Sequence, residues 1–452
     1  MSPPRPADPA RTSSGPPLIE RILEPFEHFA HTASSGGIVL LACTVIALVW
    51  ANSPWADSYH HLWELEIAIA AGPFAVRSTL HHLINDGLMV VFFFLVGLEI
   101  KREVLIGELA SLRQAALPAA AALGGMVVPA AIYAALNIGG PGAAGWGIPM
   151  ATDIACALGV LALLGNRVPA GLKVYLAALA IVDDIGAVLV IALFYTEGVS
   201  WGALGAAGVL LLLAAGANAA GVRRPWAYLL IGVALWGAVL ASGVHATIAG
   251  ILLAMAIPSR TRIDEDEFLA GARRSVGDFE RGCGPGTTVL TNQLQQEAIL
   301  TLETLCERAQ APLQTMERKL HGIVAFGIMP LFALANAGVE LTGGDYGAVL
   351  SSPVTLGIFL GLVLGKPLGI TLVSWAAVRT GLAALPGGVT WRLIHGVSWL
   401  AGIGFTMSLF VAGLAFAGAP ALLTAAKLGV LAASLAAGVC GWFLLRRAGS
   451  RE

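Results

Sequence analysis

The sequence predicts an all-α membrane protein with twelve transmembrane helices. Of its 452 residues, 57% are hydrophobic and 12% are charged, and the mean hydropathy of +0.79 lies far outside the range of soluble globular domains. The apolar residues gather into segments of about the length that a bilayer core requires. The positive charges fall almost entirely in every second connection between these segments. One segment more or fewer would place basic connections on both sides of the membrane, so the pattern supports a count of twelve.

Twelve apolar segments follow one another along the chain. The seventh and eighth are short, and only a Ser242-Gly243-Val244-His245 corner joins them. The predicted spans are Gly36 to Trp50, His82 to Glu99, Leu112 to Leu136, Pro149 to Leu164, Leu172 to Phe194, Gly198 to Ala219, Trp226 to Ser242, Val244 to Ile257, His321 to Val339, Pro353 to Val378, Ile394 to Phe416 and Ala421 to Leu445.

The distribution of basic residues predicts that both termini are cytoplasmic. Of the 26 Lys and Arg residues, Arg77 alone falls outside, Lys366 and Lys427 fall within spans, and the rest fall on the cytoplasmic side. The expected divisions are a polar, Pro-rich cytoplasmic tail over residues 1–33, a twelve-span domain over residues 34–445 and a second cytoplasmic tail over residues 446–452.

Two connections are long. The external loop over residues 51–80 mixes aromatic and acidic residues around a Gly72-Pro73 turn, which favours a small hairpin and a contact surface. The cytoplasmic loop over residues 259–320 begins with a charged stretch, for which we expect a solvated linker, and its pattern predicts a helix from Gln293 to Lys319.

Composition also excludes several function classes. The net charge is only −2, and no basic cluster with interleaved aromatic residues occurs, so a nucleic-acid partner is not expected. The cysteines are odd in number and form no CxxC pair, which argues against a disulfide framework or a zinc site. We expect no cofactor. The cysteines are Cys43, Cys156, Cys283, Cys306 and Cys440.

The main candidate site is the carboxylate pair Asp183 and Asp184, at the centre of the apolar stretch from Leu176 to Phe194. An ionisable side chain at this depth costs at least roughly 2.5–3.5 kcal/mol, so such residues usually mark an ion pathway. The alternative without a transport role is that the two aspartates only take part in a structural, buried ion pair. Neighbouring residues on a helix point about 100° apart, so one carboxylate should supply the site and the other its rim or access path.

Two spans contain interruptions at corresponding positions. Pro149 removes a backbone donor shortly before Thr152 and Asp153, and Gly402 and Gly404 weaken the helix before Thr406. Freed backbone in a membrane must face protein or a watery cavity, and paired interruptions point to a transporter site between inverted repeats. We assign the repeats to spans 3–5 and 10–12, with the interrupted helices crossing at the midplane. The bland alternatives are an N-cap for Asp153 and simple packing for Thr406.

Lys366 supplies the fourth charge inside the membrane. Its ammonium needs an anion or the negative end of a half-helix, and Asp153, Asp183 and Asp184 are the available anions. It also fits a purely structural counter-ion. Burial raises the pKa of a carboxylate and a nearby ammonium lowers it, so a proton and a cation can compete for one aspartate. Oxygen ligands suit a hard monovalent cation, Na⁺ or Li⁺, at Asp183 and Asp184.

Together these residues resemble the NhaA family of bacterial sodium/proton antiporters, from about Ser34 to Leu445. Five motifs carry the resemblance, and they occur in the same order within a twelve-span frame. They are Ala151-Thr152-Asp153-Ile154-Ala155, Val182-Asp183-Asp184-Ile185-Gly186-Ala187, Ser242-Gly243-Val244-His245-Ala246-Thr247, Gly365-Lys366-Pro367-Leu368-Gly369 and Gly402-Ile403-Gly404-Phe405-Thr406-Met407-Ser408.

The resemblance implies an electrogenic exporter of Na⁺ or Li⁺ that takes up external protons in the bacterial inner membrane, for sodium and pH homeostasis. It implies that Asp183 and Asp184 bind the ion, with Asp184 the more central. It further implies that Asp153 and Lys366 compensate the half-helix dipoles, and that Lys366 pairs with Asp183. Members are typically homodimers that contact through the first external loop.

The family also carries a cytoplasmic pH-responsive cluster, which Glu99, Arg102, Glu103 and Glu317 match here. The sequence departs from the family in a long loop before Glu317 and in Arg318, which stands where a titratable His is expected. An ordinary charged helix end is the bland alternative for the cluster. His245 fits both an interface histidine and a proton-responsive one.

Two rival functions remain open from the residues alone. An intramembrane aspartyl protease would take its aspartates from separate helices with a Gly-x-Gly-Asp sequence, whereas Asp183 and Asp184 are adjacent and that sequence does not occur. A sodium-coupled organic solute symporter would hold a cation and an organic ligand together, and only proton release on addition of sodium separates it from an exchanger.

Overall fold

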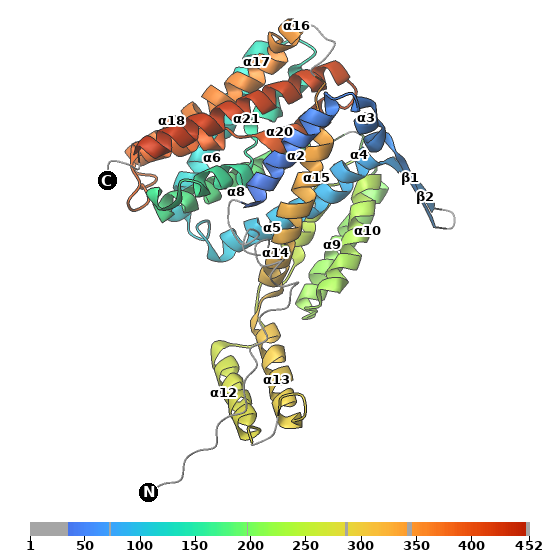
Figure 1. Ribbon diagram of the computed structural model, residues 1–452, viewed down its shortest axis with the longest axis vertical. Helices are drawn as coiled ribbons and strands as arrows, with labels where there is room; N and C mark the ends of the chain where they lie inside the picture. The colour runs from blue at the N-terminus through green and yellow to red at the C-terminus, as the bar shows by residue number, and fades with distance from the viewer. Residues whose placement is uncertain (1–34, 72–73, 197, 285–287, 341–345, 449–452) are drawn as a thin grey trace.

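The computed structural model describes residues 35–71, 74–196, 198–284, 288–340 and 346–448. The predicted N-terminal tail, the Gly72-Pro73 turn and the last four residues of the predicted C-terminal tail lie outside the described residues. Helices make up nearly the whole fold, and the longer ones pack into one body (Figure 1).

Among the described residues, eight helices are long and apolar enough to cross a membrane, and ten if each of two bent pairs counts as one span. The eight are α4–η1–α5 (Leu80–His82, Leu83–Leu88, Met89–Ile106), α6 (Leu112–Asn137), η2–α7 (Ala143–Met150, Ile154–Ala162), α8 (Ala170–Phe194), α9 (Trp201–Ala219), α14–η4–α15 (Pro312–Ile323, Val324–Ile328, Met329–Asn336), α17–η5–α18 (Pro353–Leu360, Gly361–Gly365, Lys366–Arg379) and α21 (Pro420–Ala448).

The remaining predicted spans are helical but shorter or bent. The first pair is α2 (Ser35–Ala51) with α3 (Ala56–Glu64), bent by 113°, and the second is α19 (Trp391–Ala401) with α20 (Phe405–Ala415), bent by 44°. The predicted seventh and eighth spans correspond to α10 (Pro225–Ala241) and α11 (Ile248–Ala256). Two further short helices are η3 (Gly165–Arg167) and α16 (Tyr346–Leu350).

The loop over residues 51–80 contains the expected hairpin, which is the one strand pair among the described residues of an otherwise helical fold. Strand β1 (Glu66–Ala71) pairs antiparallel with β2 (Phe74–Thr79), and Glu66 lies opposite Thr79. The hairpin projects away from the helical body beside α3 (Figure 1).

The expected linker in the first half of the 259–320 loop is wrong. That stretch forms α12 (Glu265–Arg281), which packs against α13 (Gln293–Ala309) as a helical hairpin below the body (Figure 1). Asp264 caps α12 by accepting a hydrogen bond from the N–H of Glu267 at 2.8 Å, and Gly271 allows the close approach of Leu305. The predicted helix from Gln293 is also divided, because Pro312 starts a new helix, α14.

A row of glycines brings α17, η5 and α18 against α6 and η2. Gly357, Gly361, Gly365 and Gly369 recur every four residues, and a methyl group on any of them would meet an atom of α6 or η2 within 3.0 Å. Small residues at this spacing let membrane helices approach closely, where van der Waals packing stabilises them. This contact fixes the position of Lys366, the first residue of α18, relative to α6 and η2.

Wide helical turns precede two prolines. The π-helical turn η5 leads into Lys366-Pro367, and η4 leads into Met329-Pro330. Proline cannot donate to the preceding turn, and a wider turn accommodates the missing hydrogen bond. The extra residue in η5 rotates Lys366 away from the direction that an unbroken helix would give it.

The glycine row can be tested with Gly369→Ala. The added methyl group would overlap the backbone carbonyl of Gly124 on α6, so we expect the free energy of unfolding to fall by about 1–3 kcal/mol. Gly205→Ala on α9 is the matched control, because nothing lies within 4 Å of the added methyl group. Thermal unfolding in detergent measures both variants, and equal unfolding temperatures would contradict the close contact.

Candidate functional site

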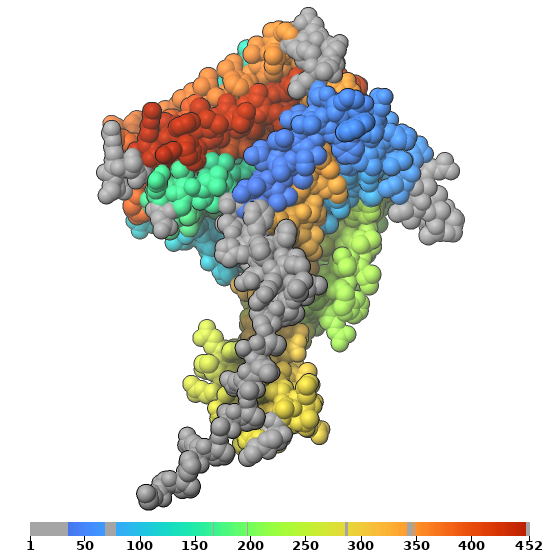
Figure 2. Space-filling model, in the orientation of Figure 1, coloured from blue at the N-terminus to red at the C-terminus, as the bar shows by residue number. Residues whose placement is uncertain are grey.

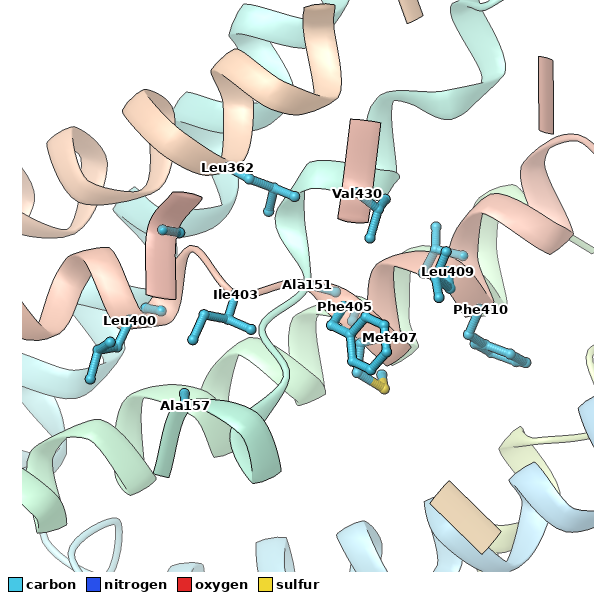
Figure 3. Close-up of a cluster of buried hydrophobic side chains, with 14 of the residues drawn as sticks. Ala151, Ala157, Leu362, Leu400, Ile403, Phe405, Met407, Leu409, Phe410 and Val430 are labelled. Atoms are coloured by element: carbon cyan, nitrogen blue, oxygen red, sulfur yellow. The ribbon is translucent and has the colours of Figure 1, made fainter. Parts of the chain in front are cut away.

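The two interrupted helices cross and bond to each other through their breaks. The N–H of Asp153, in the gap between η2 and α7, donates to the carbonyl of Ile403 at 2.7 Å. The Thr152 hydroxyl donates to the carbonyl of Ala401 at 2.9 Å. Figure 3 shows the extended stretch at Ala151 passing against the stretch at Ile403. Each break therefore satisfies backbone groups that the other leaves open.

Asp153 joins the crossing with both of its carboxylate oxygens. Oδ1 accepts the N–H of Cys156 at 3.0 Å and caps α7, so the N-cap interpretation is confirmed. Oδ2 accepts the N–H of Thr406 at 3.1 Å and also the Thr406 hydroxyl. Thr406 is therefore a bonding partner at the start of α20, and not only a packing residue.

Lys366 forms a buried ion pair at the same crossing. Its Nζ lies 2.5 Å from Oδ2 of Asp183, and it also donates to the Thr152 hydroxyl. The two charged side chains are 0% and 1% exposed. Of the three anions that the sequence offers to Lys366, the structure therefore selects Asp183. A pair at this depth needs such close geometry, since removal of two charges from water is costly.

Asp184 is buried beside this pair but is bonded differently. Its Oδ1 and the Oδ1 of Asp183 are buried without a hydrogen-bond partner among the described residues. Asp184 also interacts electrostatically with Asp183, Glu99, Asp153 and Lys366. A buried carboxylate oxygen without a partner is costly, and a proton or a hard cation would satisfy it.

The oxygen ligands available to a cation at the crossing are the carboxylates of Asp183 and Asp184, with hydroxyl and carbonyl oxygens nearby, because both oxygens of Asp153 already accept hydrogen bonds. Among the described residues, no group of three or more His, Cys, Asp and Glu side chains is placed to hold a metal ion. A site with few charges and several neutral oxygens fits a transported monovalent cation better than a firmly held divalent one. The arrangement is thus suited to reversible occupancy.

Sequence reasoning missed two serines that hold the crossing. The Ser408 hydroxyl donates to the carbonyl of Ile148 at 2.8 Å, and the Ser434 hydroxyl accepts the N–H of Phe405 at 3.1 Å. Ser408 lies within the Gly402-to-Ser408 motif, so its place two residues after Thr406 was a usable signal. Ser434 lies among small residues of α21 and gave none.

Four of the five predicted pH-response residues come together, and His245 lies apart from them. Arg102 on α5 bonds to Glu317 on α14 and, at 2.8 Å, to Glu103, while Glu99 interacts with all three electrostatically. His245 lies elsewhere, with its Nδ1 3.1 Å from the Thr247 hydroxyl and its ring edge-on to Phe410.

Comparisons with known proteins place the chain among sodium/proton antiporters. The chain matches the family described as Na+/H+ antiporter 1 over residues 27–445. It is 53% identical over 437 residues to the Na(+)/H(+) antiporter NhaA of Oleidesulfovibrio alaskensis, with 96% of each chain covered. It is 52% identical to the Na(+)/H(+) antiporter NhaA 2 of Syntrophotalea carbinolica (96% of this chain, 99% of the relative) and to the Na(+)/H(+) antiporter NhaA of Koribacter versatilis (95% and 92%).

The buried pair predicts a non-additive mutant cycle. Asp183→Asn leaves the Lys366 ammonium without its anion and should lower the free energy of unfolding by roughly 3–5 kcal/mol, whereas adding Lys366→Met should restore most of the loss. Thermal unfolding in detergent measures the two single variants and the double variant. Asp278→Asn is the control, because its ion pair with Arg281 is exposed and should contribute less than about 1 kcal/mol. Additive losses in the double variant would contradict the pairing.

Proposed function

The chain belongs to the Na+/H+ antiporter 1 family, and we propose on this basis that it exports Na⁺ or Li⁺ in exchange for external protons. It is a multi-pass membrane protein and a secondary transporter, not an enzyme. Na⁺ and H⁺ are its cargo, and exchange requires no cofactor. Such exchange would serve sodium and pH homeostasis.

The observation that carries this proposal is the unsatisfied carboxylate oxygen of Asp184 beside the Lys366–Asp183 pair. In our mechanism Asp184 binds either a proton or Na⁺, and the ammonium of Lys366 keeps the second carboxylate from holding the ion too tightly. Arrival of Na⁺ expels a proton, and arrival of a proton expels Na⁺. The family resemblance implies that more protons than Na⁺ ions move per cycle. In our proposal Asp183 carries the additional proton, which leaves when Na⁺ binds and returns when Na⁺ leaves, so transport carries net charge.

Alternating access requires that this site open to one side at a time. We assign the moving units to inverted repeats, spans 3–5 (α6, η2–α7 and α8) and spans 10–12 (α17–α18, α19–α20 and α21). The interrupted members of the two sets bond to each other at Asp153 and Thr406, which supports a site between repeats. Twelve spans and cytoplasmic termini follow from the distribution of basic residues.

The domain assignment and the partners are part of the same proposal. Residues 34–445 form the transporter domain in the bacterial inner membrane, between cytoplasmic tails at 1–33 and 446–452, with the long loop over residues 259–320 on the cytoplasmic side. The projecting β1–β2 hairpin of residues 51–80 offers open strand edges, which can pair with a second copy. We therefore propose a homodimer that contacts through this hairpin.

The ion pair of Arg102 with Glu317 supports a pH-responsive role for Glu99, Arg102, Glu103 and Glu317. These residues join α5 to α14, and Glu99 also interacts electrostatically with Asp184. A change of charge in this cluster would alter the electrostatic potential at Asp184 without a change of fold. His245 would act separately, through its contact with Phe410 on α20.

Proton flux in liposomes tests the exchange itself. We expect internal pH to respond to added Na⁺ and Li⁺ but not to K⁺ or choline, and Asp184→Asn to abolish the response because the shared carboxylate is lost. Asp278→Asn on α12 is the control and should transport normally. A sodium-coupled symporter would show uptake of an organic solute without proton release on sodium addition, and near-normal exchange by Asp184→Asn would eliminate the shared-carboxylate mechanism.

Removal of the guanidinium tests the pH response. Arg102→Gln should move the midpoint of the pH–activity profile to higher pH, because carboxylates that lose a neighbouring cation need a higher pH to ionise. The same liposome assay, repeated across pH, measures the midpoint. Arg273→Gln on the exposed helix α12 removes an equal charge and should leave it unchanged; equal shifts would assign the effect to net charge alone.

A further inference from the structure

An apolar groove runs along the outside of the body between α2, α7 and α21. Its volume is about 730 Å³, and apolar side chains form nearly all of its walls. Several of them are largely exposed, including Leu41 (61%), Leu163 (62%) and Leu435 (69%). Figure 2 shows α2 in blue and α21 in red on this face of the molecule. Exposed apolar walls at membrane depth are suited to contact with an acyl chain.

The groove reaches the break between α19 and α20. Ile403 and Phe405 line it, and so does Ser434, which accepts the backbone N–H of Phe405. An occupant of the groove would therefore touch residues that hold the crossing of the interrupted helices. It would reach them from the outer face of the body.

A second cavity, of about 450 Å³, shares the lining residue Phe443 with the groove. Its other lining residues are Arg167, Arg446 and Arg447. The guanidinium of Arg446 lies 5.0 Å from the centre of the Trp442 ring, and Trp442 also lines the groove. The positive-charge pattern assigns this cavity to the cytoplasmic side, where an aromatic residue beside basic ones is typical of the level of lipid headgroups.

We propose that the groove and the arginine cavity together bind one anionic phospholipid. The acyl chain would lie along Leu41, Leu163 and Leu435, and the phosphate would lie among Arg167, Arg446 and Arg447. A free phosphate would leave the apolar walls bare, and a zwitterionic lipid would bring a positive group to the arginines. Basic cavities between membrane helices on the cytoplasmic side bind such headgroups, and Arg is suited to bidentate contacts with phosphate.

The bound lipid would stabilise the transport site. Because the groove reaches Phe405 and Ser434, filling it should make opening of the α19–α20 break less favourable. The expected sign is a higher thermal unfolding temperature with the anionic lipid bound than without it.

The test uses the full chain, purified in detergent and stripped of lipid. Native mass spectrometry and thermal unfolding would compare phosphatidylglycerol, phosphatidylcholine and inorganic phosphate. We expect phosphatidylglycerol alone to bind specifically and to raise the unfolding temperature. Replacement of Arg167, Arg446 and Arg447 by Gln should lower affinity for phosphatidylglycerol on the order of a hundredfold, since each basic residue near an anionic headgroup is worth about fivefold.

Two further variants keep the result interpretable. Arg379→Gln is the matched control, because the Arg379 guanidinium also lies over a tryptophan ring, 5.3 Å from the centre of Trp375, but lines neither cavity. Ala432→Trp places a large ring in the exposed wall of the groove and should lower binding of phosphatidylglycerol while the arginines remain. If the triple variant folds poorly, Arg446→Gln alone should show about a fivefold loss.

Four outcomes would overturn the proposal. These are equal affinity for the two lipids, equal stabilisation by inorganic phosphate, an unchanged affinity in the triple variant, and an equal loss in Arg379→Gln. A wild-type protein that binds no lipid after stripping would assign the groove to another occupant, either the N-terminal segment or a second copy of the chain.

Discussion

The structure depends on the mutual bonding of two interrupted helices inside the membrane. A break in a membrane helix leaves backbone donors and acceptors that lipid cannot satisfy, and each such group costs several kcal/mol. Here the breaks satisfy each other, through the N–H of Asp153 on the carbonyl of Ile403 and the N–H of Thr406 on the carboxylate of Asp153. Neither interruption is tolerable alone, and together they place polar groups where an ion can bind.

The charges at the crossing divide into a satisfied set and an unsatisfied one. Asp153 uses both oxygens in hydrogen bonds, and Lys366 holds one oxygen of Asp183. Asp184 and the second oxygen of Asp183 keep open positions. A carboxylate whose oxygens all take part in hydrogen bonds has no free position for a proton or a cation, whereas a buried carboxylate with an unpaired oxygen does. The geometry therefore separates the carboxylate oxygens that hold the crossing together from those that keep an open position.

The residues alone predicted the parts of this site, and only the resemblance to the NhaA family implied the pairing of Lys366 with Asp183 that the structure shows. The Pro149 and Gly402 interruptions marked both breaks, and membrane depth marked Asp183 and Asp184. The residues alone left the partner of Lys366 open, because the wide turn η5 rotates its side chain and no residue pattern reports that wider turn. The crossing bonds of Ser434 and Ile403 arise between segments distant in sequence, which local patterns cannot relate.

Helix α12 was missed for a different reason. Its charged beginning resembles a solvated linker, although Asp264 followed three residues later by Glu267 is a usual start signal for a helix. The helix also packs against α13, where Gly271 lies close to Leu305, and only the folded hairpin reveals this packing. The predicted spans were more accurate because the bilayer constrains their length and composition directly.

The α12–α13 hairpin leaves and rejoins the body at one point. The N–H of Leu313 bonds to the carbonyl of Pro258 at 3.1 Å, and the N–H of Arg262 bonds to the carbonyl of Arg308 at 3.0 Å, so the outgoing and returning strands of chain run side by side. Because the two ends of this segment lie close together, the segment does not force the membrane helices on either side of it apart. A rigid domain from another protein could therefore replace this helical hairpin between residues 262 and 308, as a marker for electron microscopy, without displacing the membrane helices.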